Sequence, residues 1–244
     1  MCDSPSRDDA RRITSDMSGL PTQSDEQNLP TRAGPLDGMV IRLDPERTTV
    51  AVLFARADSH YKALPECDVW DIDRDARKWP GGSPVVAHPP CRAWGRLRAF
   101  ARPRKGERLL ATWSVRQVRC FGGVLEHPAS SLLWPKAGLP APGQRDKFGG
   151  WTLPIVQQWW GHKAEKKTLL YIVGCEPADV PRMPYVMGEA SHVVQSRKRT
   201  DYRPHITKAE REHTPPELAR WLVDLAMNCK TYNVADELQA TVPR

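Results

Sequence analysis

Short apolar runs alternate with segments of helical spacing along the middle of the chain, and this alternation constrains the fold more than any other feature. Apolar runs bounded by turn residues predict strands over residues 49–55, 68–72, 84–87, 123–125 and 168–174. Helices are predicted over 107–120, 153–160 and 215–228, the last with Thr214 as its N-cap. Strands that alternate with helices predict an α/β fold, with a mostly parallel sheet and helices on both faces.

The ends of the chain differ from this central region. Residues 1–38 are polar and lack apolar periodicity, so we expect a disordered N-terminal extension. Residues 39–228 are predicted to form one domain, followed by a flexible C-terminal tail over 229–244. No apolar run is long enough for a membrane span or a secretory signal, which predicts a cytoplasmic protein.

Composition favours a polyanionic partner. The chain has a net charge of +7, which suits phosphate contacts, and nine tryptophans, whose faces could stack on bases or simply fill the core. Its six cysteines lack paired spacing, which argues against a disulfide framework and a ribbon-type zinc site. We therefore expect free thiols.

Two predicted strand ends carry reactive groups. Cys91 follows Pro89 and Pro90 just after the 84–87 strand, and Glu126 lies at the mouth of the next strand. A cysteine can add to C6 of a cytosine ring when a carboxylic acid binds ring N3, so this pair could be the core of a catalytic site. Otherwise the Pro-Pro-Cys loop is a rigid turn and the glutamate a helix cap. Arginines after Cys91 are expected to lower its thiol pKa.

The order of several motifs resembles the DNA cytosine-5 methyltransferase family. The motifs are Pro89-Pro90-Cys91, Glu126-His127-Pro128, the run Lys163–Lys167 leading into a strand, and the stretch His213–Ala219 before the last helix. The resemblance covers residues 49–226 and is that of a small, divergent phage or prophage member in a bacterial host cell. It implies a Rossmann-like methyltransferase fold and methyl transfer from S-adenosylmethionine to cytosine C5.

The resemblance also implies roles for individual residues. The expected catalytic residues are Cys91, Glu126 and Lys167. The expected cofactor-binding residues are Phe54, Ala55, Asp58, Asp71, Asp73 and Pro89. The expected DNA-binding residues are Arg92, Trp94, Arg96, Arg98, Arg197, Lys198 and Arg199. A minimal insert over 175–213 replaces the family's large recognition domain, which predicts DNA binding with little sequence specificity.

Departures from the family keep other functions open. Arg56-Ala57-Asp58-Ser59 stands where the family has glycines, and Lys166 and Lys167 stand where it has arginines. One alternative is cytosine modification with another donor or on a free nucleotide, and another is a non-catalytic DNA-binding protein. We expect no metal, although two sets of side chains are candidate sites. These are His88, Cys91, Cys120 and His127 for zinc, and Asp71 and Asp73 for magnesium.

Overall fold

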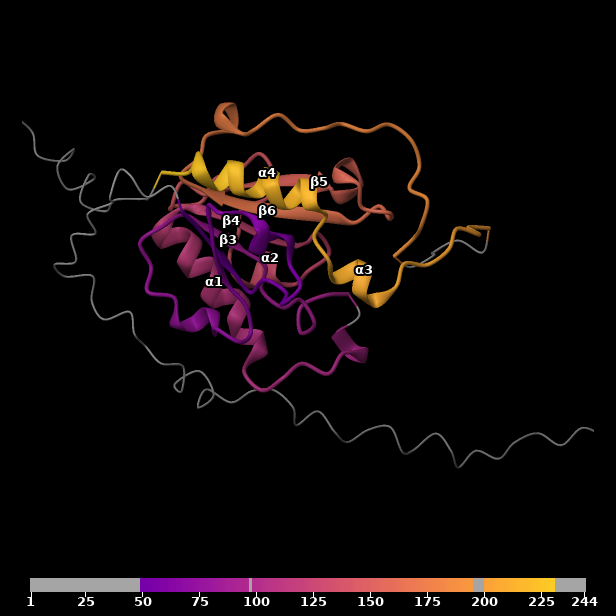
Figure 1. Cartoon of the computed structure of the whole chain (residues 1–244), viewed down its shortest axis with the longest axis horizontal. Coiled ribbons are helices and arrows are strands. Elements are labelled where there is room, and N and C mark those ends of the chain that lie inside the picture. The colour runs from indigo at the N-terminus through magenta and orange to yellow at the C-terminus, as the bar shows by residue number, and fades with distance from the viewer. Residues whose placement is uncertain (1–48, 97, 195–199, 231–244) are drawn as a thin grey trace, which may run out of the picture. The chain divides into compact units, whose positions relative to one another are not determined.

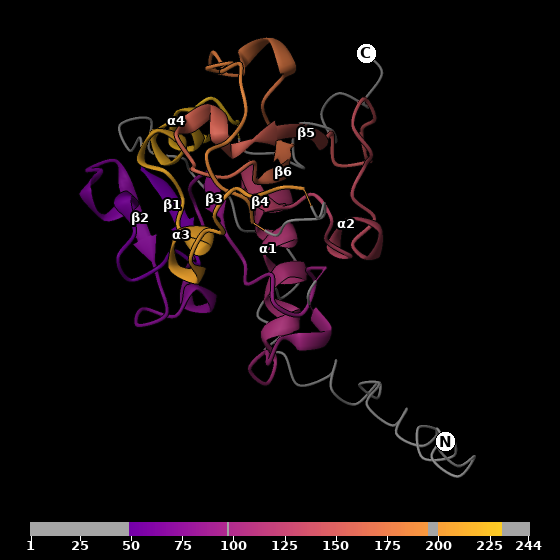
Figure 2. The same cartoon turned by 90° about the vertical axis from the view of Figure 1, so that its right-hand side faces the viewer.

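Six strands form a single mixed sheet in the order β2-β1-β3-β4-β6-β5, as Figure 2 shows. The computed structural model describes residues 49–96, 98–194 and 200–230. The strands are β1 (Val50–Leu53), β2 (Cys67–Trp70), β3 (Val85–Ala87), β4 (Gly123–Pro128), β5 (Trp151–Val156) and β6 (Lys167–Val173). Strands β1 to β4 pair in parallel, whereas β6 runs antiparallel to both β4 and β5. The mostly parallel α/β sheet predicted from sequence is therefore confirmed.

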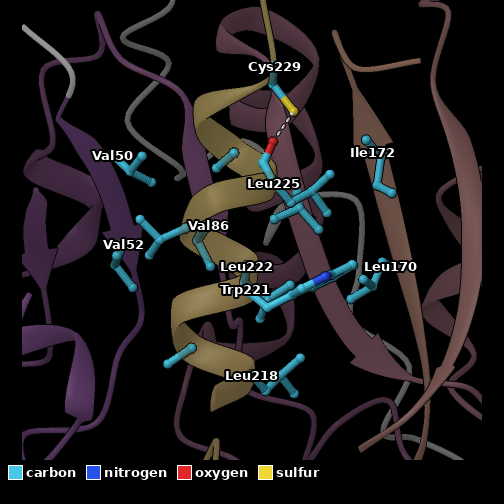
Figure 3. Packing of buried hydrophobic residues seen from close by; sticks show 14 of the residues in the cluster. Val50, Val52, Val86, Leu170, Ile172, Leu218, Trp221, Leu222, Leu225 and Cys229 are labelled. Atoms are coloured by element: carbon cyan, nitrogen blue, oxygen red, sulfur yellow. Dashed lines mark hydrogen bonds between the residues drawn. The ribbon is translucent and has the colours of Figure 1, made fainter. Parts of the chain in front are cut away.

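Helices cover both faces of this sheet (Figure 1). The helices are α1 (Glu107–Phe121), α2 (Leu133–Lys136), α3 (Lys208–Glu212) and α4 (Pro216–Met227). Successive strand residues point to opposite faces, so one set of side chains packs on α4 and the alternate set on α1. Val86, Val124 and Leu170 join Leu218 and Leu222 in the core on the α4 face, which Figure 3 shows from close by.

The α1 face has its own core. Ala87, Leu125 and Tyr171, each one residue from a member of the α4-face core, pack with Val115 and Val118 of α1. Both cores contain residues with no measurable exposure, which a two-sided sheet requires. No helix in the described ranges has the length and apolar character needed to cross a membrane.

The helix predicted over 153–160 is wrong. Residues Trp151–Val156 form strand β5, and Gln157–Trp160 form a single 3-10 turn. Strand β5 lies at the edge of the sheet, where Pro154 can sit because it need not donate a hydrogen bond to a further strand. Its antiparallel pairing with β6 runs from Trp151 opposite Ile172 to Val156 opposite Lys167.

The boundaries of the last helix also need correction. Pro215 precedes α4 and the helix has no side-chain cap, so the prediction of Thr214 as N-cap is wrong. The C-terminal tail does not begin at residue 229, because Cys229 is buried and the Lys230 amide donates to Gly174 O at 2.8 Å. The predicted N-terminal extension over 1–38 and the tail beyond Lys230 lie outside the described residues.

Candidate functional site

A cluster of polar side chains extends the α4 face of the sheet beyond the carboxyl ends of the parallel strands. His88 lies two residues after Val86, and Glu126 lies two residues after Val124, so both continue the side of the sheet that faces α4. Gln157 follows Ile155 in the same way. The carboxyl ends of parallel strands are where ligand sites form in open α/β sheets.

Hydrogen bonds link these side chains into a continuous network. Tyr61 Oη lies 2.8 Å from His88 Nε2, and His88 Nδ1 lies 3.3 Å from Glu126 Oε2. On the other side, Gln157 Nε2 donates to Glu126 Oε1 at 2.9 Å and to Thr168 Oγ1 at 3.0 Å. Both carboxylate oxygens of Glu126 are therefore fixed by side chains from separate elements.

The charge of Glu126 determines which atoms donate the hydrogen bonds among these side chains. Burial raises the pKa of Glu126, but the charge of Lys166 and the hydrogen bond from His88 outweigh burial and lower the pKa to about 2. An ionised carboxylate only accepts hydrogen bonds, so Nδ1 of His88 carries a proton. Burial and the charge of Glu126 raise the pKa of Tyr61, which therefore stays a phenol and can donate a hydrogen bond to His88 Nε2.

Removal of the Tyr61 hydroxyl is expected to weaken the fold slightly. Tyr61 is 1% exposed, and a Tyr61→Phe change leaves its ring in place while His88 Nε2 loses its donor. We expect the free energy of unfolding to fall by about 1 kcal/mol, measured by urea titration. Tyr202→Phe, which removes a hydroxyl from a side chain that is 90% exposed, is the control and should change stability by less. Equal effects would contradict a structural role for the Tyr61 hydroxyl.

Lys166 supplies the positive charge at this site. Its backbone oxygen accepts hydrogen bonds from the Gln157 amide at 3.1 Å and from Thr168 Oγ1 at 3.3 Å, so its place just before β6 is fixed. The charge of Lys166 lowers the pKa of Glu126 and also acts on Cys91. The same lysine is therefore near both predicted catalytic groups.

The predicted role of Lys167 does not fit its position. Lys167 begins β6 one residue later, where the side chain points to the other face. Its side chain is 69% exposed and its Nζ lies 3.3 Å from Glu165 Oε1. The structure thus places Lys166, and not Lys167, beside Glu126.

Cys91 is presented on a braced loop at the edge of this cluster. Its carbonyl oxygen accepts hydrogen bonds from the amides of Trp94 at 3.0 Å and Gly95 at 2.8 Å, which forms a turn. Trp94 is buried, and its carbonyl accepts from the Leu132 amide at 3.0 Å. Cys91 itself is exposed, so a ligand can approach it.

The electrostatic environment of Cys91 is the reverse of the one predicted. Desolvation by surrounding protein atoms raises the pKa of the Cys91 thiol, and the charge of Glu126 raises it further, whereas Lys166 lowers it. The expectation that nearby arginines would lower this pKa is wrong, because the strongest charge acting on the sulfur is that of Glu126. The same interaction indicates that Cys91 and Glu126 lie close to each other.

The predicted DNA-binding residues have different environments in the structure. Arg92 is bound to the buried carboxylate of Glu107, through Nε at 2.9 Å and Nη2 at 2.6 Å, and so has a structural role. Trp94 is 4% exposed and cannot stack on a base without leaving the core. Arg96 and Arg98 are exposed on the loop after Cys91. Arg197, Lys198 and Arg199 lie outside the described residues.

The residues predicted to bind S-adenosylmethionine do not fit that cofactor. Asp71, which would hold the ribose, is 5% exposed and already binds Lys62 Nζ at 2.6 Å and the amides of Asp73 and Arg74. Asp58 is paired with Arg56 Nε at 2.8 Å. These acids have the partners that a turn and a surface ion pair require, so a ribose would have to compete with Lys62 and Arg56 for them.

Phe54, another predicted cofactor contact, is also a poor fit for S-adenosylmethionine. Phe54 has a φ of 62° and lies against Trp113, with ring centroids 5.8 Å apart, so a bulky side chain stands where the family has open backbone. Ala55 and Pro89 are buried, whereas Asp73 is exposed.

Within the described ranges, no three His, Cys, Asp or Glu side chains are grouped so that they could hold a metal ion. The five cysteines that the structure describes are free thiols, as expected, and they are Cys67, Cys91, Cys120, Cys175 and Cys229. Compared with known proteins, the chain matches no family model, no curated protein and no solved structure.

Most of the groups that surround Glu126 do not stand out in the sequence. Tyr61 and Gln157 belong to none of the predicted sites, and His88 is predicted only as a candidate zinc ligand. A usable signal existed for Gln157, since a glutamine that continues the buried face of an apolar strand needs polar partners. Tyr61 carried no such signal, because nothing local shows that its hydroxyl reaches a residue 27 positions away.

Proposed function

We propose that this protein is an enzyme that adds the Cys91 thiol to C6 of cytosine in DNA and thereby activates C5 for substitution. The proposal rests on one observation: an exposed cysteine beyond β3 lies close to the buried, ionised Glu126 on the neighbouring strand β4. The sheet topology is compatible with the Rossmann-like fold of cytosine-5 methyltransferases, and the motif order supports the same family.

The proposed chemistry uses groups of this chain. As the bond between Cys91 Sγ and C6 forms, the C5–C6 π electrons move toward N3, and the thiol proton is transferred so that N3 becomes N–H. The carboxylate of Glu126 accepts a hydrogen bond from this N3–H, which stabilises the adduct in a site of low polarity. C5 then gains electron density and can take an electrophile, after which the C5 proton is lost to solvent, the C5–C6 double bond re-forms as the thiolate departs, and the N3 proton returns to the thiolate.

The donor of the new group is the point on which this chain differs from the family. Because Asp71 and Asp58 are engaged by Lys62 and Arg56, the structure favours the alternative in which C5 accepts a group from a donor other than S-adenosylmethionine. A base within duplex DNA would have to be flipped out to reach Cys91.

Covalent trapping tests the proposed nucleophile without knowledge of the donor. Single-stranded DNA that contains 5-azacytosine, whose ring nitrogen at position 5 makes C6 more electrophilic and takes up a proton in place of a donor's group, is expected to form an adduct with the wild-type protein, visible as a mass increase equal to the oligonucleotide. Cys91→Ser should form none, whereas Cys120→Ser, which removes another exposed thiol, should form the adduct normally.

Exchange of the cytosine C5 proton with deuterium from D₂O gives a second readout that needs no donor and follows the reversible adduct. If neither an adduct nor exchange is seen with DNA, the non-catalytic alternative is favoured. A signal with deoxycytidine monophosphate alone would assign the free nucleotide as substrate.

A further inference from the structure

Residues 207–214 form a strap that is held to the rest of the protein only at its surface. The strap contains α3 and lies between two buried residues, Ile206 and Pro215. None of residues 207–214, all of which the structure describes, is buried. Figure 1 shows α3 set apart from the sheet and joined to α4 by an extended segment. A segment with no buried residue of its own has low local stability and opens easily.

Two carboxylates of the strap bind cations near the site. Glu210 Oε1 lies 2.5 Å from Lys163 Nζ, and Glu212 Oε2 lies 3.4 Å from Arg56 Nη1. Lys163 precedes the site residue Lys166, and Arg56 follows β1 in the loop that leads to Tyr61. The strap therefore joins the loop after β1 to the segment before β6.

The strap also lies near the proposed nucleophile. The charge of Glu212 raises the pKa of the Cys91 thiol and the pKa of Arg92. His213, the next residue, lies against His60 with ring centroids 4.9 Å apart. Glu212 thus places a negative charge close to Cys91, where a DNA substrate would bring its own phosphates.

We infer that Arg56 and Lys163 form a phosphate-binding surface for a nucleic-acid strand, and that Glu210 and Glu212 occupy this surface until the strand displaces the strap. The inference rests on the proposed function for the identity of the polyanion. The strap also carries Lys208 and Arg211, but it is its two acids that pair with Arg56 and Lys163. Phosphates can replace these carboxylates at little cost because exposed ion pairs contribute little stability.

Binding of single-stranded DNA to charge-neutral strap variants tests this inference. The Glu210→Gln, Glu212→Gln double variant removes both carboxylates and keeps the capping box of α3, since glutamine can replace glutamate there. All proteins carry Cys91→Ser, so no covalent adduct contributes. We expect the double variant to bind a mixed-sequence oligonucleotide about tenfold more tightly than its parent in fluorescence anisotropy.

The salt dependence of binding gives a second expectation. In the parent, Glu210 pairs with Lys163, and Glu212 shares Arg56 with Asp58, whereas in the variant Lys163 loses its carboxylate partner and Arg56 keeps only Asp58. The plot of log affinity against log salt concentration should therefore be steeper for the variant, by about 0.7 for Lys163 and by less for Arg56. Amide hydrogen exchange in residues 207–214 of the parent should become faster when the oligonucleotide binds.

The matched control has the same change in net charge elsewhere. Glu217→Gln with Asp224→Asn alters two exposed acids of α4 and should strengthen binding less than threefold, by roughly the effect of a distant charge. The inference is wrong if the strap variant binds DNA no more tightly than this control, or if the oligonucleotide leaves exchange in the strap unchanged. Tighter binding without any 5-azacytosine adduct in proteins that retain Cys91 would uphold the binding surface and reject only the proposed chemistry.

Discussion

A Glu126→Gln variant is expected to exchange the C5 proton of cytosine roughly a thousandfold more slowly than the wild-type protein. Glutamine keeps the volume of the buried side chain but has no negative charge to hold a proton on N3. The adduct with Cys91 would then form with unbalanced charge on the ring. Deuterium incorporation at C5, followed by mass spectrometry of nucleosides released from single-stranded DNA, measures this rate directly.

A second variant separates charge from packing. Thr168→Val removes the hydroxyl that accepts from Gln157 and donates to the Lys166 carbonyl, but it leaves the Glu126 carboxylate intact. We expect this change to slow exchange by about tenfold or less, since it removes a single neutral hydrogen bond. If Glu126→Gln exchanges at a rate similar to that of Thr168→Val, the carboxylate has no special part in the reaction. Urea unfolding of both variants shows whether either loss reflects an unfolded protein.

The fold was largely predictable because its strands and long helices carry strong local patterns. Val50–Leu53 and Lys167–Val173 are short apolar runs between turn residues, and α1 and α4 repeat apolar residues at helical spacing. Local patterns do not distinguish a helix from a strand at Trp151–Val156, where part of a helix was predicted and β5 is found. Aromatic and aliphatic residues fill both a buried helix and an edge strand, and Pro154 was the one local feature that disfavoured a helix.

The site was less predictable because its contacts join distant segments. Cys91 and Glu126 could be selected because each follows or ends a predicted strand, and parallel strands bring their carboxyl ends together. His88 and Gln157, however, bind Glu126 across separations of 38 and 31 residues. The prediction of Lys167 as the catalytic lysine, where Lys166 lies at the site, has a simpler cause. An error of one residue at a strand end moves a side chain to the other face.

The pKa of the Cys91 thiol is hard to predict from the sequence for a related reason. The arginines after Cys91 are near it in sequence, yet Arg92 is bound to the buried Glu107. The charges that act most strongly on the thiol come from Glu126 in β4 and from Lys166 just before β6. Charge counted along the chain therefore predicted the wrong direction for the thiol pKa.

The wild-type protein is expected to lose about 2 kcal/mol of stability between pH 7 and pH 5 through His127. His127 is fully buried on the α1 face of β4, and neither ring nitrogen has a hydrogen-bond partner among the described residues. Burial lowers its pKa from 6.5 to about 4, against a smaller opposing effect of Glu126. Between these values the unfolded chain binds a proton that the folded chain does not, so stability is complete above pH 6.5 and falls toward pH 4.

Urea titrations of the wild type and of His127→Leu at both pH values measure this effect. Leucine leaves no buried nitrogen without a partner, so the variant should match or exceed the wild-type stability at pH 7 by up to about 1 kcal/mol. The variant should lose less stability than the wild type on acidification. Some loss should remain, because burial also lowers the pKa of His162.

Between pH 7 and pH 5, the loss of stability comes from buried histidine and not from the carboxylate of Glu126. Glu126 has a pKa of about 2 in the folded protein against a usual value of 4.5, so its contribution is complete at pH 5 and is lost only below pH 4.5. A decline in stability above pH 5 therefore reports on buried histidine and not on the carboxylate that is proposed to act on cytosine. Parallel losses in the wild type and His127→Leu would mean that His127 takes up its proton in the folded protein as readily as in the unfolded chain, in conflict with its burial between the sheet and α1.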